Sequence, residues 1–517
     1  MARLKEYNGR YCESEYEYAF IGFLEEEGWK YTSGNKISRV TKRDVLIEDD
    51  FKNFIADGNP DLTEEEVTQI YDTVRLVGAE SDFATLHKVY NWLVDGIQFT
   101  PKDGSARMIP LINFEKDGVK NIFRVVNQFT VEYTNNGQKE NRRPDVILFV
   151  NGMPLCIMEL KNPADANATI YDAWEQINIR YWRDIPHLLH YCPLACISDG
   201  VKTRLGTVRT PYEHFYAWRR VNDGDAVSTL PFAETETMIK GVYSPERFLE
   251  IFRDYIYFQD SIYDSDEVEI VCRYPQFFAA RLLKQSIVDS VVTKSGRGGT
   301  YFGATGCGKT YTMAFLARQL ALRCTDISEI GSPTIILIVD RDELQKQGAK
   351  LFTKSTEFLN LGEVSIVKNR TQLRQELGAR QSGGFYICTI QKFCDREDDK
   401  IGLINDRQNI ICFSDEAHRT QLEHSKKIQF SKDADANMKA MVSKPYAKVL
   451  KEAFPQATFV GFTGTPIAET YQTFGDEIDR YTMDQAVADG LTVSIKYHPR
   501  IAKVLLDNKK VKEIENY

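Results

Sequence analysis

A glycine-rich segment in the second half of the chain constrains the fold more than any other feature. It follows the short apolar run Tyr301-Phe302, precedes the helical stretch Met313 to Leu320, and matches the phosphate-loop pattern throughout. Its pattern residues are Gly303, Thr305, Gly306, Cys307, Gly308, Lys309 and Thr310, with Ala304 between the first two. Such a loop joins a buried strand to the N-terminus of a helix, where backbone N–H groups can surround an anion. The segment therefore predicts an α/β fold with a doubly wound parallel sheet.

The pattern on both sides of this loop supports that sheet. Short apolar runs alternate with helical stretches from about residue 266 to about 487, as in a parallel sheet with crossover helices. The predicted strands are 301–302, 335–339, 385–389, 410–413 and 458–462.

An acidic pair follows one of these strands. Asp415 and Glu416 come directly after the apolar run Ile410 to Phe413, so their carboxylates should emerge at the carboxyl edge of the sheet, beside the phosphate loop. In a nucleotide site, Lys309 would reach the β and γ phosphates. The Thr310 hydroxyl and Asp415 would hold Mg²⁺, and Glu416 would act as the base for the attacking water. The sequence thus predicts an ATP and Mg²⁺ site.

A second set of charged residues lies in the first half. Asp145 begins an apolar strand, Asn151-Gly152 is a strong hairpin signal, and the returning strand carries Glu159 and Lys161 two residues apart, on one face. Carboxylates on adjacent strands can bind Mg²⁺, which activates water and neutralises charge on phosphorus, while Lys161 would orient the nucleophile. The alternative is an ordinary solvated strand face, on which Glu-x-Lys pairs are common.

The register of this hairpin tests the metal site. A regular two-residue turn at Asn151-Gly152 would set Asp145 opposite Met158 and turn Glu159 to the other face. A three-residue loop ending at Met153, or a bulge near Pro154, would set Asp145 opposite Glu159. We expect the longer loop or the bulge.

Size and composition allow about three folded units in 517 residues. We expect domains at 1–225, 266–487 and from 488 onward, with a connecting helical region at 226–265 whose helix begins at Ser244-Pro245. The sequence shows neither a long apolar segment nor a secretory signal, which favours the cytoplasm and no membrane partner. The ten cysteines form no Cys-x-x-Cys pair, so we expect buried thiols and no structural zinc. The net charge of −9 leaves a local basic groove possible.

The second half resembles superfamily 2 helicase-type motors, whose RecA-like domain carries the phosphate loop, an Asp-Glu-Ala-His box ending here at His418, and a later Thr463-Gly464-Thr465. The resemblance implies that Thr463 and Thr465 couple the nucleotide state to the DNA track, and that His418 of the nucleotide site lies across from them. It also implies that Arg273 and Gln276 belong to the nucleotide site, with Gln276 reading adenine; an exposed surface glutamine is the alternative. Thr389 to Gln391 and Asp340-Arg341 would touch the nucleic-acid backbone.

Such motors complete their site with an arginine from a second RecA-like domain. The segment 488–517 is expected to be only the truncated start of that lobe, so this chain alone should bind ATP poorly or hydrolyse it slowly.

The first half resembles RecB-like nucleases with a PD-ExK motif, carried here by Pro144-Asp145 and Glu159 to Lys161. That family also has a Gln-x-x-x-Tyr element. Gln176 and Tyr181 are spaced one residue more widely, so packing is an equal explanation for Tyr181. Glu17 in the opening helix is a candidate second acid, with a surface position as the favoured explanation.

A RecB-like nuclease followed by such a motor is similar to the restriction (R, HsdR-type) subunit of type I restriction-modification enzymes, in its amino-terminal portion. The segments 197–200, 206–207 and Trp218 add to this resemblance. It implies an ATP-dependent translocase and type I site-specific deoxyribonuclease that acts on double-stranded DNA with methyltransferase (M) and specificity (S) subunits. Two alternatives remain: a DNA-repair helicase-nuclease without those partners, and a nucleotide-switched DNA-binding module with a degenerate nuclease site.

Overall fold

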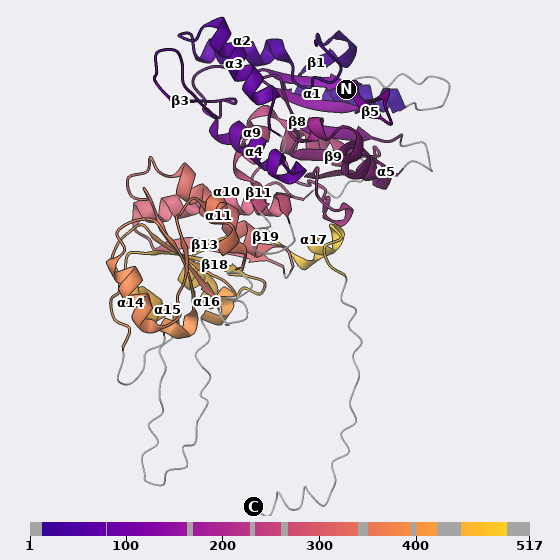
Figure 1. The fold of residues 1–517 in the computed structure, drawn as a ribbon. Coiled ribbons are helices and arrows are strands. Elements are labelled where there is room, and N and C mark those ends of the chain that lie inside the picture. The colour runs from indigo at the N-terminus through magenta and orange to yellow at the C-terminus, as the bar shows by residue number, and fades with distance from the viewer. Residues whose placement is uncertain are drawn as a thin grey trace, which may run out of the picture.

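The computed structural model describes residues 13–78, 80–162, 169–227, 233–259, 267–304, 306–339, 350–393, 400–420 and 446–493. These residues form two α/β units, one above the other in Figure 1, joined by a region of short helices and a hairpin. No helix in the described ranges is long and apolar enough to cross a membrane.

The upper unit is built on a mixed six-stranded sheet. Its strands follow the order β1 (Lys30–Ser33), β4 (Phe123–Asn127), β7 (Val146–Val150), β8 (Met153–Leu160), β9 (Leu194–Ser198) and β10 (Thr203–Thr207). The pairs β1/β4 and β8/β9 are parallel and the other pairs are antiparallel. Every residue of β7, β8 and β9 is buried, so the centre of the sheet forms the core.

Helices and two small hairpins surround this sheet. The helices are α1 (Glu13–Glu26), α2 (Glu48–Gly58), α3 (Glu64–Arg75), α4 (Asp82–Asp95), α5 (Ile170–Glu175), α6 (Trp182–Asp184) and α7 (Pro186–Leu189). The hairpins pair β2 (Ile97–Phe99) with β3 (Arg107–Ile109) and β5 (Val131–Asn135) with β6 (Gln138–Arg142).

The strand-like run from Val125 to Tyr133 is divided between two strands, β4 and β5. Gln128 has a positive φ of 54°, which ends β4, and the chain then enters β5 of a separate hairpin. Gly34 packs directly under this break: a Cβ there would lie 2.7 Å from the carbonyl oxygen of Asn127. Apolar composition gave no sign of the change of direction.

The connecting region contains α8 (Glu234–Met238), the π-helical turn Ile239–Tyr243, α9 (Pro245–Asp254) and the hairpin of β11 (Ile256–Gln259) and β12 (Val268–Val271). Helix α9 begins as predicted, with Ser244 in an extended conformation and Pro245 at the first position, although the Ser244 side chain makes no capping hydrogen bond. The region is not wholly helical, because β11 falls within it.

The lower unit confirms the doubly wound parallel sheet. Its order is β15 (Val364–Ile366), β16 (Phe385–Thr389), β14 (Thr334–Val339), β17 (Ile410–Ser414), β18 (Thr458–Thr463), β13 (Arg297–Gly303) and β19 (Glu477–Tyr481), with all neighbours parallel. Its helices are α10 (Tyr274–Thr293), α11 (Lys309–Arg323), α13 (Thr356–Leu359), α14 (Arg370–Ala379), α15 (Tyr446–Ala453), α16 (Ala468–Phe474) and α17 (Met483–Ala488). Because the strands are parallel, the phosphate loop and the residues after β14, β16, β17 and β18 share one edge.

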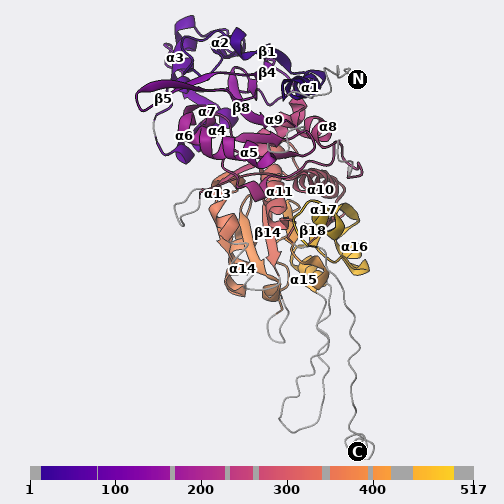
Figure 2. The same cartoon turned by 90° about the vertical axis from the view of Figure 1, so that its right-hand side faces the viewer.

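Buried ion pairs connect the two units. Arg323 at the end of α11 donates to Asp254 at the end of α9, and Arg220 lies 3.0 Å from Asp479 of β19. Figure 2 shows α10 and α11 directly below the upper unit. The domain limits at residues 225, 265 and 487 remain predictions.

Candidate nuclease and nucleotide sites

The hairpin between β7 and β8 has the bulge that the metal site requires. Asn151 and Gly152 form a two-residue turn with positive φ at both positions. Beyond Pro154 the register shifts, and Leu155 is the extra residue on its strand. Continuing the shifted register by one pair sets Asp145 opposite Glu159, on the same face. The predicted bulge near Pro154 is confirmed.

Asp145, Glu159 and Lys161 lie together at the end of these strands. Asp145 Oδ2 accepts a hydrogen bond from the backbone N–H of Leu160 at 2.9 Å. Glu159 is fully buried, and its Oε2 lies 3.7 Å from Lys161 Nζ. Burial first, and then the negative charge of Asp145, raise the pKa of Glu159 well above its ordinary value, while Lys161 opposes the shift. The solvated-face alternative is therefore wrong for Glu159.

Gln176 and Tyr181 belong to the same cluster. The segment Gln176–Tyr181 is a π-helical turn, in which one extra residue per turn keeps positions five apart on one face. Gln176 Nε2 donates to the Tyr181 hydroxyl at 2.8 Å, and that hydroxyl donates to Glu159 Oε1 at 2.5 Å. Lys161 Nζ donates to Gln176 Oε1 at 3.0 Å. The wider spacing is thus absorbed by the π turn, and Tyr181 is more than a packing residue.

Glu17 is not a surface acid, contrary to the favoured explanation. It is 5% exposed, and its two carboxylate oxygens accept hydrogen bonds from Asn127 Nδ2 at 2.5 Å and Gln128 Nε2 at 2.6 Å. The backbone N–H of Gln128 in turn donates to the carbonyl oxygen of Asp145 at 3.0 Å. Sequence reasoning missed Asn127 and Gln128, because their role depends on the break after β4 and no motif marks it.

The donor set fits a hard divalent cation with few protein ligands. Asp145 and Glu159 supply carboxylate oxygens, and Glu159 Oε2 is buried without a hydrogen-bond partner among the described residues. A buried oxygen in that state is costly unless a ligand satisfies it. The described residues contain no group of three or more acidic, His or Cys side chains arranged to hold a metal. Mg²⁺ suits such a site because it keeps several waters and uses one or two carboxylates.

The phosphate loop adopts the backbone that its pattern predicts. Gly306 and Gly308 have positive φ of 83° and 82°, and α11 starts at Lys309. Gln276 lies against this loop: it is 2% exposed, its Oε1 accepts from the Arg273 backbone N–H at 2.9 Å, and its Nε2 reaches the Gly308 carbonyl at 3.4 Å. The exposed alternative for Gln276 is therefore wrong. Thr305 lies outside the described residues, as do Asp340 and Arg341.

The acidic pair lies beside this loop, as expected. Lys309 Nζ donates to the Gly303 carbonyl at 3.3 Å and lies 3.9 Å from Glu416 Oε1. Burial, reinforced by Glu416 and opposed by Lys309, raises the pKa of Asp415 to about 6. Thr310 follows Lys309 in the first turn of α11, and Cys307 is buried in the loop.

His418 connects the acidic box to the end of β18. Its Nδ1 lies 2.8 Å from Thr463 Oγ1, 3.2 Å from Thr465 Oγ1 and 3.5 Å from Glu416 Oε2. One imidazole thus joins the candidate base to both threonines. Thr389 ends β16 at the same edge of the sheet, with Gln391 in the 3₁₀ turn that follows.

The nucleotide site also has features that fit a triphosphate. The Arg273 guanidinium lies 4.6 Å from the centre of the Tyr216 ring, and its Nη1 is buried without a hydrogen-bond partner among the residues that the structure describes. The amino end of α11, Lys309 and the two left-handed glycines provide an anion cradle. The Nη1 group of Arg273 is therefore an available hydrogen-bond donor close to the phosphate loop.

Comparison with known proteins assigns a class to each half. Residues 11–214 match the family model described as type I restriction enzyme R protein N terminus, and residues 275–516 match the SWI2/SNF2 ATPase model. The first part of the chain is therefore similar to R-protein amino-terminal regions, and the second part is similar to SWI2/SNF2 ATPases.

Comparison with individual proteins gives a more specific similarity. The chain is 31% identical over 507 residues to the type I restriction enzyme HindI endonuclease subunit of Haemophilus influenzae, covering 94% of this chain and 46% of that protein. It is 30% identical over 527 residues to the protein named as the MjaIXP type I endonuclease subunit of Methanocaldococcus jannaschii, covering 95% and 46%. This chain is thus similar over nearly its whole length to type I restriction endonuclease subunits, and it spans about half the length of the curated relatives it matches.

Among solved structures, the matches include one named as a fragment of an HsdR subunit from Vibrio vulnificus YJ016. It is 15% identical and covers 71% of this chain and 56% of that one, with a TM-score of 0.26.

Proposed function

We propose that this chain supplies the ATP-driven motor and the DNA-cutting site of a type I restriction enzyme. The motor would pull duplex DNA, and the upper unit would cut it after translocation. The observation that carries the proposal is the bulged register, which puts Asp145 and Glu159 on one face with Lys161 and Tyr181 around them. Without the bulge, the two acids would lie on opposite faces of the sheet.

In this proposal the upper unit is a PD-ExK nuclease. Asp145 and Glu159 would hold Mg²⁺, which supplies an activated water and neutralises negative charge at phosphorus. Lys161 would position the attacking water, held in place by Gln176 at 3.0 Å. Tyr181 would fix the orientation of the Glu159 carboxylate through their hydrogen bond.

The lower unit would bind ATP with Mg²⁺. Lys309 and the loop N–H groups would hold the phosphates, Thr310 and Asp415 the metal, and Glu416 the attacking water. His418 would transmit the state of that site to Thr463 and Thr465 at the DNA-facing edge. A second RecA-like domain would complete the site.

The partners we propose are double-stranded DNA and the methyltransferase and specificity subunits. Co-purification of the protein with a methyltransferase distinguishes this proposal from a DNA-repair helicase-nuclease, which would be purified without a methyltransferase.

Three substitutions test the two sites separately. Plasmid DNA, ATP and Mg²⁺ are incubated with the assembled complex containing Asp145→Ala, Glu159→Ala or Lys309→Ala. We expect all three to stop cutting, but only Lys309→Ala to stop ATP turnover. Cutting that survives Asp145→Ala or Glu159→Ala would refute the nuclease site, and continued ATP turnover in Lys309→Ala would refute the motor site.

A further inference from the structure

A cleft of 600 Å³ opens beside the candidate nuclease site, between the β5–β6 hairpin and the segment containing α6 and α7. Both of its walls continue directly into that site. Strand β6 ends at Arg142, three residues before Asp145, and Arg183 on the opposite wall follows Tyr181 by two residues. Figure 2 shows β5 and α6 on the same side of the upper unit. Anything held in the cleft would therefore lie next to the cutting position.

Three arginines and two carboxylates line this cleft. Asp184, whose side chain is 5% exposed, accepts from Arg142 at 2.6 Å and from Arg183 at 2.7 Å. Glu140 accepts from the Tyr133 hydroxyl at 2.6 Å and from Asn135 Nδ2 at 2.9 Å. Both acids are thus occupied by groups of the cleft itself.

The third arginine, Arg43, adds a positive charge that these acids do not neutralise. The Arg43 guanidinium forms no ion pair with any residue in the described ranges, whereas its neighbour Asp44 is engaged by Thr41 and Arg75. His187 also lines the cleft, and burial, with Arg43 and His190 nearby, lowers its pKa to about 4. It is neutral at pH 7, so the arginines give the cleft a net charge of +1.

The loop that carries Arg43 is held firmly in place. Arg39 donates to the carbonyl oxygens of Asp44 at 3.1 Å and Thr130 at 2.9 Å, and the Lys42 carbonyl accepts from the Glu132 backbone N–H at 3.0 Å. The loop is therefore attached to β5, the strand that forms the cleft wall. Arg43 is presented from a fixed backbone, which lowers the entropic cost of ordering it on a ligand.

We propose that this cleft binds phosphates of the DNA strand that flank the scissile bond, with Arg43 as the main contacting side chain. Arg183 donates to Asp184 through Nε and Nη2, but its side chain is 64% exposed and its Nη1 can add a single contact. The inference rests on the proposed nuclease function. Guanidinium groups pair with phosphate oxygens in two-pronged geometry, and phosphate contacts of this kind set the position of a duplex without reading its sequence. Arg142, tied to Asp184, is a positioning residue for the cleft wall.

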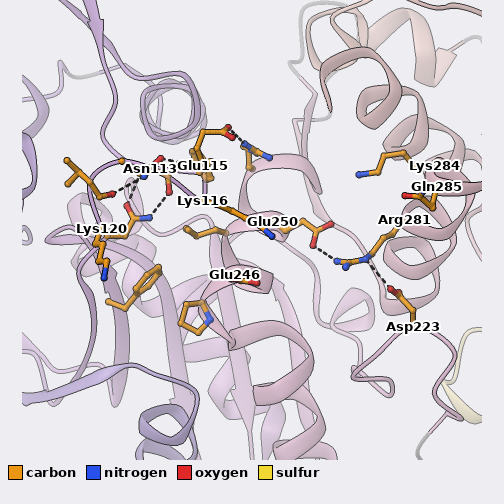
Figure 3. Close-up of a pocket in the computed structure, with 18 of the residues that line it drawn as sticks. Asn113, Glu115, Lys116, Lys120, Asp223, Glu246, Glu250, Arg281, Lys284 and Gln285 are labelled. Atoms are coloured by element: carbon orange, nitrogen blue, oxygen red, sulfur yellow. Dashed lines mark hydrogen bonds and ion pairs between the residues drawn. The ribbon is translucent and has the colours of Figure 1, made fainter. Parts of the chain in front are cut away.

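A second cleft supplies the control. It measures 820 Å³ and lies between the loop 113–121, α9 and α10 (Figure 3). Lys120 lines it just before β4, whose first residue pairs with Val150, at the opposite end of β7 from Asp145. Lys120→Glu therefore changes the net charge as much as Arg43→Glu does, far from the candidate nuclease edge.

The experiment measures binding of a short labelled duplex to the 517-residue chain, with Ca²⁺ in place of Mg²⁺, between about 50 and about 200 mM salt. We expect Arg43→Glu to weaken binding about tenfold at the lowest salt and to reduce the slope of log K against log salt by about 1. Lys120→Glu should bind as the unsubstituted chain does. Arg183→Ala should weaken binding in the same direction, and Arg43→Lys should restore most of it.

Two outcomes would overturn the inference. One is equal DNA binding by Arg43→Glu and Lys120→Glu, with circular dichroism spectra showing both to be folded. The other is intact DNA binding in Arg43→Glu together with loss of methyltransferase or specificity subunits in a pull-down, which would make the cleft a protein-docking site. The nuclease proposal is tested separately, by DNA cutting with Asp145→Ala. A result that overturns phosphate binding in the cleft can therefore be distinguished from one that overturns the nuclease site.

Discussion

The ion pair between Arg323 and Asp254 should hold the nucleotide-binding helix to the rest of the chain. Arg323 Nε donates to Asp254 Oδ1 at 3.0 Å and Oδ2 at 3.1 Å, and Nη2 donates to Oδ1 at 2.6 Å. Asp254 is 2% exposed, while the Arg323 side chain is 25% exposed. Arg323→Met keeps the aliphatic length and leaves a buried carboxylate whose remaining ion pair, with Arg253, spans 3.5 Å.

Removing one partner of a buried pair costs about 3 to 5 kcal/mol. The partial exposure of Arg323 and the remaining Arg253 favour the lower end, about 3 kcal/mol. Hydrogen exchange of the α11 backbone amides measures this, because a loss of that size increases the open population on the order of a hundredfold.

The charge state of Asp254 at neutral pH follows from its pKa. Burial is the largest influence and would raise it, but the hydrogen bonds and charge of Arg323, with the charges of Arg253 and Arg318, lower it below the ordinary value of 3.8. Asp254 is therefore charged at pH 7. Stability from this pair is complete above 3.8 and is lost only as the pH falls through the lowered pKa.

Arg281→Met is the matched control. Arg281 also joins α10 to α9, 2.7 Å from Glu250, but its side chain is 37% exposed (Figure 3). Exposed pairs contribute about 0 to 1 kcal/mol, so exchange of the α11 amides should change about fivefold or less. Equal effects of the two substitutions would refute the argument that burial decides the strength of the Arg323 pair.

The remaining predictions concern the two sites. Tyr181→Phe removes the hydroxyl that orients Glu159, and plasmid cutting by the complex should fall about 10- to 100-fold while ATP turnover stays unchanged; a fall in both would argue for misfolding. Gly308→Ala puts a Cβ 2.5 Å from Gln276 Nε2 and should abolish binding of a fluorescent ATP analogue, whereas Gly306→Ala, with open space and a similar φ, should weaken it less. Deleting exposed Ile179 converts the π turn to α-helical spacing and should preserve cutting; loss of cutting would show that the extra residue is needed.

Some features of both sites were predictable because strand geometry determines them. The phosphate loop had to follow a buried strand, and Asp415 had to emerge at the same edge, since parallel strands end together. The bulge at Leu155 was predictable from chemistry: two acids that share a metal must share a face, and a two-residue turn alone forbids that for Asp145 and Glu159.

Other features depend on tertiary packing and had no sequence signal. In an α-helix, residues five apart, such as Gln176 and Tyr181, would not share a face. They do share one in the structure because the segment forms a π turn, which the sequence did not indicate. Glu17 appeared as one acid among several in an amphipathic helix, yet two amides hold it in the interior. The two arginines on Asp184 come from opposite walls of a cleft whose existence follows from the β5–β6 hairpin, not from any local pattern.

The two sites are joined by a short path of rigid elements. Helix α11 begins at Lys309 in the phosphate loop and ends at Arg323 on Asp254, the last residue of α9. The turn just before α9 contacts the upper unit, where Trp29 Nε1 donates to the Tyr243 carbonyl at 2.6 Å. A movement of α11 that follows the nucleotide would therefore be passed to α9 through the buried Arg323–Asp254 ion pair, together with the hydrogen bond from Arg318 to the Arg253 carbonyl oxygen. If the two sites communicate along this path, Arg323→Met should uncouple cutting from ATP turnover more strongly than Arg281→Met does, because only the former removes a buried connection.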